Sequence, residues 1–316
     1  MNQPLSYVHP AAKIAKTVVI EPFTTIAKDV IIGEGTWIGS NVTIMEGARI
    51  GKNCNIFPGA VISANPQDLK YNNEKTYVEI GDNVTIRECV TINKGTNDRL
   101  KTVIGNNCLI MAYSHIAHDC FVGNNCIFSN NSTLAGHVTT GDYVILSGFV
   151  AVHQFCHIGS HSFVAGGSLV RKDVPPYVKA AREPLSYVGI NSVGLRRRGV
   201  ESEKIREIQN IYRILYLEGR NNSQAIEVAK NQTKINQKAD DIVINYLDSC
   251  FLVSNPVYAA ISANSDNFKE ILNDPLWKLI LSWLNEKNIP LSLMLGVKRA
   301  VNSLSLIHIS EPTRPY

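Results

Sequence analysis

The amino-acid sequence predicts a mainly β protein, in which a parallel β-helix of hexapeptide repeats is followed by a small α-helical C-terminal domain. Three observations predict this fold. Isoleucine occupies every sixth position from Ile14 to Ile62, a small or β-branched residue stands two positions before most of these isoleucines, and the period ends near Gly199. Neither an α-helix nor a flat strand has a period of six, whereas stacked short repeats build a β-helix.

The six-residue period continues in phase beyond Ile62, with apolar residues at Ile80, Ile86, Ile92, Ile104, Ile110, Ile116, Val122, Phe128, Leu134, Leu146, Val152, Ile158, Val164 and Val170. Charged residues break the series at Asp68 and Glu74, within QDLKYNNEKTY, and at Asp98, within KGTNDRLKT. Because the repeat resumes in phase after each break, we expect both segments to be loops that leave the β-helix.

Each repeat is expected to contain a short strand and a corner. Positions two apart on a strand share a face, so the apolar residue and the small residue before it both point inward. Glycine often follows the apolar residue, as at Gly33, Gly51 and Gly105, where a corner needs a permissive backbone. Three repeats then make a triangular coil of 18 residues, and adjacent coils lie about 4.8 Å apart.

One outward-facing column of residues is apolar. Leu109, Ile127, Ile145 and Phe163 follow one another at a spacing of 18 residues, so they should stack on one face of the β-helix. Large exposed apolar patches usually mark interfaces between proteins. We therefore expect this face to be buried against another subunit of a homo-oligomer.

Composition and charge indicate an ordinary globular protein. The chain has 316 residues, 45% of them hydrophobic, and a net charge of +4, which is too small to indicate a nucleic-acid partner. No signal peptide or long apolar run occurs, so we expect a cytoplasmic protein without stable membrane insertion. The seven cysteines include no C-x-x-C pair, which argues against a zinc ribbon or a disulfide scaffold.

The stretch Ser114–Cys120 reads SHIAHDC and permits three interpretations: a metal site, a catalytic base with its orienting carboxylate, or buried packing. The six histidines from His115 to His161 all fall outside the inward positions, which disfavours packing. His118 falls at a corner, and Gly136 and His137 come 18 and 19 residues later, one coil above. With His153 a further 16 residues on, we expect three histidines to gather along one edge.

This edge is suited to acid–base chemistry. An imidazole beside a carboxylate such as Asp119 acts as a general base near neutral pH. The backbone N–H of Gly136, one coil away, is placed to stabilise an oxyanion. Three histidines from neighbouring coils or subunits, with water in the fourth position, would instead form a zinc site as in the hexapeptide-repeat carbonic anhydrases, and the spacing alone does not exclude that alternative.

The motifs QDLKY, HIAHDC, LAGHV, AVHQF and DVPPYV, in this order, resemble the UDP-N-acetylglucosamine 3-O-acyltransferase family from Val8 to about residue 250. The resemblance implies a left-handed β-helix, a homotrimer and no metal or cofactor. It implies transfer of a 3-hydroxyacyl group from acyl carrier protein to the 3-hydroxyl of UDP-N-acetylglucosamine, the first step of lipid A synthesis. It also implies that His118 is the general base, that Asp119 supports the imidazolium, and that Gly136 is the oxyanion donor.

The same resemblance implies substrate contacts from Gln67, Asp68, Lys70, His115, His137, His153, Gln154, Asn191, Arg197 and Arg198. Gly166 matches the position whose side chain limits acyl length in the family, so a glycine there predicts a longer acyl chain. Two departures leave details open. Val193 stands where an acidic residue is frequent, and Pro184 stands where relatives carry a histidine.

Beyond Gly199, apolar residues at 205, 208, 211, 212 and 215 predict a helix ended by Gly219, and Ser223 begins a second predicted helix. We therefore divide the chain into a β-helix (1–190), a helical domain (191–250) and a tail outside the resemblance (251–316). The last residues, SLIHISEPTRPY, look like translated adapter sequence.

Three alternative functions stay open at this point. The first is the N-acyltransferase of the same pathway, and the second is a trimeric zinc carbonic anhydrase-like enzyme. The third is a β-helical scaffold without catalysis. The sequence also leaves open whether the sugar acceptor carries a 3-hydroxyl or a 3-amino group, and how long the acyl chain is.

Overall fold

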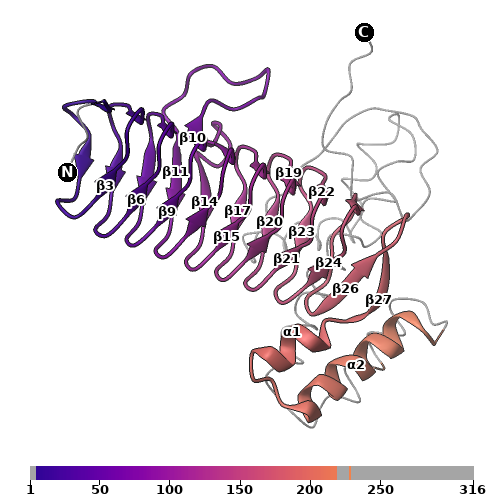
Figure 1. The fold of residues 1–316 in the computed structure, drawn as a ribbon. Coiled ribbons are helices and arrows are strands. Elements are labelled where there is room, and N and C mark those ends of the chain that lie inside the picture. Colours follow the sequence, from indigo (N-terminus) through magenta and orange to yellow (C-terminus); the bar gives the residue numbers. More distant parts are fainter. Residues whose placement is uncertain (1–4, 219–227, 229–316) are drawn as a thin grey trace, which may run out of the picture. The chain divides into compact units, whose positions relative to one another are not determined.

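The computed structural model describes residues 5–218 and residue 228. Most of this part of the chain forms a parallel β-helix (Figure 1). Most strands are only two residues long, as the six-residue repeat requires. The strands stack into three parallel sheets, which form the three faces of a prism. Only the pairing between the last two strands, β26 and β27, is antiparallel among the described residues.

The first face contains β1 (Tyr7–Val8), β4 (Thr25–Ile26), β7 (Thr43–Ile44), β10 (Val61–Ala64), β13 (Thr91–Asn93), β16 (His115–Ile116), β19 (Thr133–Leu134), β22 (Ala151–Val152) and β25 (Leu169–Val170). The second face contains β2 (Lys13–Ile14), β5 (Ile31–Ile32), β8 (Ala48–Ile50), β11 (Tyr77–Ile80), β14 (Lys101–Ile104), β17 (Phe121–Val122), β20 (Thr139–Thr140) and β23 (His157–Ile158). The third face contains β3 (Val19–Ile20), β6 (Trp37–Ile38), β9 (Asn55–Ile56), β12 (Thr85–Ile86), β15 (Leu109–Ile110), β18 (Ile127–Phe128), β21 (Ile145–Leu146), β24 (Phe163–Val164), β26 (Val178–Ala181) and β27 (Ser186–Ile190).

The core is a ladder of the residues that define the period. Ile116 pairs with Leu134, Leu134 with Val152, and Val152 with Val170, each step covering 18 residues. All four side chains are buried, and stacking them removes a continuous apolar surface from water. The predicted inward orientation and the 18-residue coil are confirmed.

The outward apolar column is also confirmed. Leu109 pairs with Ile127, Ile127 with Ile145, and Ile145 with Phe163, so the four residues lie in register on the third face. Each is half-buried in the single chain.

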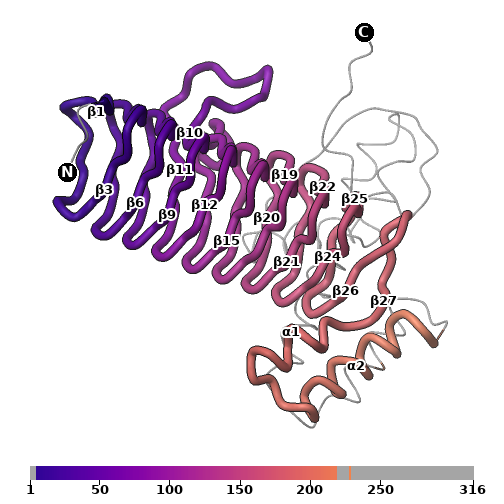
Figure 2. The backbone as a smooth tube through the Cα atoms, viewed as in Figure 1, coloured from indigo at the N-terminus to yellow at the C-terminus, as the bar shows by residue number. Residues whose placement is uncertain are grey.

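Three edges connect the faces, and we number them by the turns they contain. Edge 1 includes residues 117–120, 135–138 and 153–156; edge 2 includes 123–126, 141–144 and 159–162; edge 3 includes 129–132, 147–150 and 165–168. The two predicted loops, residues 65–76 and 94–100, both leave the coil where edge 1 passes, after β10 and β13. Figure 2 shows the longer loop extending away from the stacked coils.

Two helices follow the strands. Helix α1 (Ser192–Arg197) was not predicted, and its N-cap is Asn191, whose side chain accepts a hydrogen bond from the Gly194 N–H. Helix α2 (Ser202–Tyr216) was predicted, and it buries Ile205, Ile208, Ile211, Tyr212 and Ile214. Of the five apolar residues that predicted the helix, Leu215 is only half-buried, and Ile214 is buried in addition to the other four.

Some predictions fall on residues outside the described part of the chain. They include the second helix from Ser223 and the tail 251–316. The domain boundaries stay a prediction, although the last strand ends at Ile190 and the first helix begins at Ser192. Neither described helix has the length and apolar character that a membrane crossing requires.

Candidate active site

The candidate site is built on edge 1, where successive coils place residues 18 apart above one another. His118, Gly136 and Gln154 share one turn position, and Asp119, His137 and Phe155 share the next. Backbone hydrogen bonds fix this stacking: His137 N donates to His118 O at 3.0 Å, and Phe155 N donates to Gly136 O at 3.1 Å. Gly136 therefore lies one coil from His118, as predicted.

His118 and Asp119 form a hydrogen-bonded pair. The imidazole Nδ1 lies 2.9 Å from Asp119 Oδ2; the imidazole is 12% exposed and the carboxylate is fully buried. Burial raises the pKa of the Asp119 carboxyl, but hydrogen bonds from His118 and Thr96 outweigh it and hold the pKa below its ordinary value. An ionised carboxylate fixes Nδ1 as the protonated nitrogen and leaves Nε2 able to accept a proton.

Gly136 lies directly against the His118 ring. A Cβ atom at position 136 would be 2.6 Å from His118 Cε1 and 2.7 Å from Nε2, so no larger residue fits while the ring keeps its place. In the described part of the chain the Gly136 N–H donates no hydrogen bond. A backbone N–H without a hydrogen bond, on a residue that packs against the imidazole, is one of the groups that can stabilise an oxyanion.

His137 packs between His118 and Phe155. Its ring meets the His118 ring edge-on at 5.1 Å and stacks on Phe155 at 4.5 Å. Its Nδ1 lies 3.1 Å from an Asp98 carboxylate oxygen, but without hydrogen-bond geometry. Burial lowers the pKa of His137, and the carboxylates of Asp119 and Asp98 offset this effect only in part.

The expected gathering of three histidines is thus correct for His118 and His137, but the ring that stacks on His137 belongs to Phe155. His153 lies two residues before Phe155 on the same edge and is exposed. Its Nδ1 lies 3.2 Å from the Gln154 carbonyl oxygen. The aromatic residue was overlooked because only histidines were considered for this edge. Its spacing of 18 residues from His137 is the signal that would have identified it.

The remaining predicted residues near edge 1 lie on its strands and loops. His115 is on β16, and its Nδ1 lies 2.7 Å from Thr91 Oγ1. Burial lowers the pKa of His115, as does the nearby His118. Gln67, Asp68 and Lys70 lie on the 65–76 loop, where Asp68 accepts a hydrogen bond from the Lys70 backbone N–H at 2.9 Å.

Three ligand-type side chains at this edge have the spacing of a metal site. Atoms of His118, Asp119 and His137 lie within 4.8 Å of one another. The group contains two histidines and a carboxylate, not the three histidines of the zinc alternative. The Asp119 oxygens also accept hydrogen bonds from the Thr96 N–H and hydroxyl.

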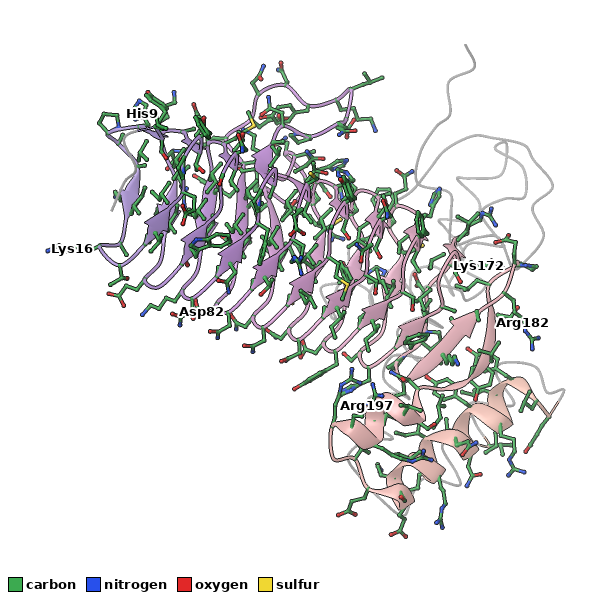
Figure 3. All side chains as sticks on the ribbon, viewed as in Figure 1. His9, Lys16, Asp82, Lys172, Arg182 and Arg197 are labelled. Carbon is green, nitrogen blue, oxygen red and sulfur yellow. The ribbon has the colours of Figure 1, made fainter. Side chains whose placement is uncertain are left out.

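A second group of predicted residues lies at edge 2. Arg198 covers the Tyr143 ring at 5.0 Å, donates from Nη2 to the Tyr143 carbonyl oxygen, and has Nη1 3.5 Å from His161 Nδ1. Asn191 Nδ2 donates to the His161 carbonyl oxygen at 2.9 Å. Arg197, labelled in Figure 3, is exposed on α1, as is Val193.

His161 and its neighbours were not predicted as site residues. The His161 ring is stacked between Tyr143, at 4.8 Å, and Tyr177, at 5.4 Å. Burial lowers the pKa of His161 to about 4, and Arg198 contributes in the same direction. The spacing of 18 residues between Tyr143 and His161 was the available signal.

Gly166 lies on edge 3 and is exposed. A Cβ atom added at this position would lie 3.1 Å from the Gly148 carbonyl oxygen and no closer than 3.8 Å to the next nearest atom. The predicted residues therefore fall on three edges: the catalytic pair on edge 1, the arginines beside edge 2, and the acyl-length position on edge 3.

Three family models match this chain. The model described as UDP N-acetylglucosamine O-acyltransferase, domain 2, matches residues 173–248. The bacterial transferase hexapeptide model, with six repeats, matches residues 101–136, and the GMPPB C-terminal domain model matches residues 2–103.

Similar proteins and structures agree with these matches. Acyl-[acyl-carrier-protein]--UDP-N-acetylglucosamine O-acyltransferase from Stenotrophomonas maltophilia (strain K279a) is 45% identical over 57% of this chain and 67% of its own length. A UDP-N-acetylglucosamine acyltransferase structure from Bacteroides fragilis 9343 is 44% identical, covers 78% of this chain and 96% of its own, and has a TM-score of 0.75. A UDP-N-acetylglucosamine acyltransferase structure from Francisella novicida is 43% identical, covers 78% of this chain and 90% of its own, and has a TM-score of 0.75. The predicted class, a left-handed parallel β-helix with a small helical C-terminal part, is confirmed.

Proposed function

This chain belongs to the family of acyl-[acyl-carrier-protein]--UDP-N-acetylglucosamine O-acyltransferases, the enzymes of lipid A synthesis, and we propose that His118 is its general base. The reaction proposed is transfer of a 3-hydroxyacyl group from acyl carrier protein to the 3-hydroxyl of UDP-N-acetylglucosamine. The observation that carries the proposal is the His118–Asp119 pair, with Nδ1 bound to a buried carboxylate at 2.9 Å and Nε2 beside Gly136.

Each proton and bond in the proposed reaction has a partner. His118 Nε2 takes the proton from the sugar 3-hydroxyl as its oxygen attacks the thioester carbon. The carbonyl oxygen becomes an oxyanion, which the Gly136 N–H stabilises. The C–S bond then breaks, and the imidazolium returns the proton to the thiolate of the acyl carrier protein. Throughout, Asp119 stabilises the charge on the imidazolium.

The other residues at edge 1 are proposed to position the substrates. His137 is buried with a lowered pKa, so a neutral ring lines the site at pH 7 and adds no second positive charge beside His118. His115, His153 and Gln154 are assigned to the acyl and sugar ends on family resemblance. Gln67, Asp68 and Lys70 supply polar groups from the loop that leaves the same edge.

Arg197 and Arg198 are proposed to bind the diphosphate of the nucleotide sugar. Guanidinium groups suit phosphate because they donate two parallel hydrogen bonds. Asn191 is assigned differently from the sequence expectation. Its buried side chain caps α1 and donates a hydrogen bond to the His161 carbonyl oxygen. We therefore propose that Asn191 holds α1, and with it Arg197 and Arg198, against edge 2.

A homotrimer is proposed to complete the site. The catalytic pair and the diphosphate residues lie on different edges of one chain. We propose that the third face of each chain, which lies between edges 2 and 3 and carries the column of Leu109, Ile127, Ile145 and Phe163, packs against the side of the neighbour that carries edge 1, so that edge 2 of one chain meets edge 1 of the next.

The test is transfer from a panel of 3-hydroxyacyl-acyl carrier proteins to UDP-N-acetylglucosamine, comparing the wild-type protein with His118→Ala. Removal of a general base lowers the rate by about 100- to 10,000-fold, with little change in thermal unfolding. The panel also reports the acyl length that Gly166 admits. Full activity in His118→Ala would overturn the proposal, and loss of wild-type activity on chelation would favour the metal site instead.

A further inference from the structure

The loop 94–100 folds over the Asp119 carboxylate. The backbone N–H of Thr96 donates to Oδ1 at 2.9 Å and to Oδ2 at 3.1 Å, and the Arg99 N–H donates to Oδ1 at 3.2 Å. The Thr96 hydroxyl donates to Oδ2 at 2.6 Å. Thr96 and Asp119 are both buried, so these bonds are made away from water, where hydrogen bonds to a charged group are strongest.

One oxygen of Asp119 connects the loop to the proposed base. Oδ2 accepts from the Thr96 hydroxyl on one side and lies 2.9 Å from His118 Nδ1 on the other. The charged and titratable groups around this carboxylate are His118, His137 at 3.8 Å from Oδ2, and Arg99 and Asp98 on the loop. Among these groups only His118 takes part in the proposed proton transfer.

Arg99 holds the loop in this position. Its Nη1 donates to the Asp119 carbonyl oxygen at 3.0 Å and to Thr139 Oγ1 in the next coil at 3.2 Å. Its guanidinium also covers the Phe121 ring at 5.1 Å. The loop that carries the Thr96 hydroxyl is therefore held in place by the contacts of Arg99 with Asp119, Thr139 and Phe121.

We propose that Thr96 is a positioning residue for the reaction, whose hydroxyl fixes the Asp119 carboxylate so that Oδ2 stays directed at His118 Nδ1. This inference rests on the proposed role of His118 and adds a residue to it. Thr96 itself contacts no reacting atom. Its effect passes through Asp119 to the orientation of the imidazole, where a displacement of about 1 Å costs up to about 100-fold in rate.

The test compares Thr96→Val, which keeps the shape and the backbone N–H but removes the hydroxyl, with Thr96→Ser, which keeps the hydroxyl. We expect Thr96→Val to lower kcat by about 10- to 100-fold with KM unchanged, and Thr96→Ser to restore most of kcat. Thr24→Val is the matched control, because Thr24 is buried and its hydroxyl donates to the Gly39 carbonyl oxygen far from edge 1. It should keep full activity. If Thr96→Val does not fold, Thr96→Ala replaces it.

A double-mutant cycle separates positioning from general loosening of the fold. In an Asp119→Asn background Thr96→Val should lower kcat no further, because the carboxylate that it positions is gone. Wild-type kcat in Thr96→Val, or a loss that multiplies in full with that of Asp119→Asn, would overturn the inference. His118→Ala is run in parallel: if it keeps activity, the proposed base is wrong, and if it alone loses activity, only the role of Thr96 is wrong.

Discussion

At the scale of single residues, the conformation of the turn at Asp119 explains why a carboxylate lies beside His118. Asp119 has φ of 58°, in the left-handed region, and the equivalent turn residues Asn107, Asn125 and His137 have φ of 57°, 57° and 63°. Aspartate and asparagine tolerate this conformation better than most residues. The coil therefore needs a left-handed residue at this position anyway, and an aspartate there places a carboxylate beside His118.

Gly136 gives the sharpest prediction at this scale. Gly136→Ala should lower kcat by about 100-fold, because a methyl group 2.6 Å from His118 Cε1 must displace the ring. The measurement is steady-state kcat together with the unfolding midpoint. Gly148→Ala is the folding control, since Gly148 has the same turn position on edge 3 and its added Cβ would lie 3.5 Å from the Asn130 oxygen. Wild-type kcat in Gly136→Ala would mean that the ring is not held where the structure places it.

The sequence predicted the residues that sit on the repeat better than those that leave it. His118, Asp119 and Gly136 were placed by counting in steps of 18, and their contacts agree. Thr96 was missed because KGTNDRLKT interrupts the count, so nothing in the period says which coil the loop covers. His161 was missed for another reason: its partners Asn191 and Arg198 flank α1, whose docking position is not encoded in the repeat.

At the scale of elements, the contact between α1 and edge 2 is the junction on which the nucleotide end of the proposed site depends. The helix is only six residues long, too short to be stable by itself. Its position comes from the Asn191 cap and from the contacts of Arg198 with Tyr143 and His161. The longer α2 supports it, with Tyr212 donating a hydrogen bond to the Pro176 carbonyl oxygen at 2.6 Å.

This junction predicts sensitivity to acid. The pKa of His161 is about 4 in the folded chain and about 6.5 in an unfolded one. The unfolded state therefore binds more protons between these values, and stability falls as the pH is lowered from about 6.5 to 4. His161→Phe keeps a ring between Tyr143 and Tyr177 but cannot be protonated, so its unfolding temperature should fall less between pH 7 and pH 5 than that of the wild-type protein.

The control for this experiment is His157→Gln, since His157 is exposed on β23. It removes an imidazole that lies outside the Tyr143–Tyr177 stack, 3.8 Å from Asp173, and so reports the effect of losing a histidine elsewhere on the β-helix. An identical fall in unfolding temperature for His161→Phe and the wild-type protein would show that the stacked histidine does not titrate with folding.

At the scale of the whole molecule, the regular spacing of the coils determines which residues lie close together. Residues on one edge are separated by multiples of about 4.8 Å, and residues on different edges are kept apart by the packed core of Ile116, Leu134 and Val152. Because one prism holds the proposed catalytic pair on edge 1 and the proposed diphosphate residues beside edge 2, we propose that neighbouring chains share each site. In the proposed homotrimer, the apolar column on the third face is one of the two surfaces that pack together.

Shared sites predict complementation between two inactive variants. His118→Ala lacks the base and Arg198→Ala lacks the diphosphate contact, so each alone should be inactive. In trimers formed by coexpression of equal amounts, about a quarter of the sites pair an intact His118 with an intact Arg198 from the neighbouring chain. The mixture should therefore recover about a quarter of wild-type activity, measured by transfer to UDP-N-acetylglucosamine, with mixed trimers verified by mass spectrometry of tagged chains.

The control for complementation is coexpression of His118→Ala with Asp119→Asn. These residues form one hydrogen-bonded pair within a chain, so no arrangement of the two variants rebuilds an intact pair, and the mixture should show no more activity than Asp119→Asn alone. Recovery in the first mixture but not in the second can arise only if each site takes edge 1 from one chain and the arginine from another. Verified mixed trimers without activity would instead place His118 and Arg198 in a site formed by a single chain, which requires the substrate to extend across the second face between their edges.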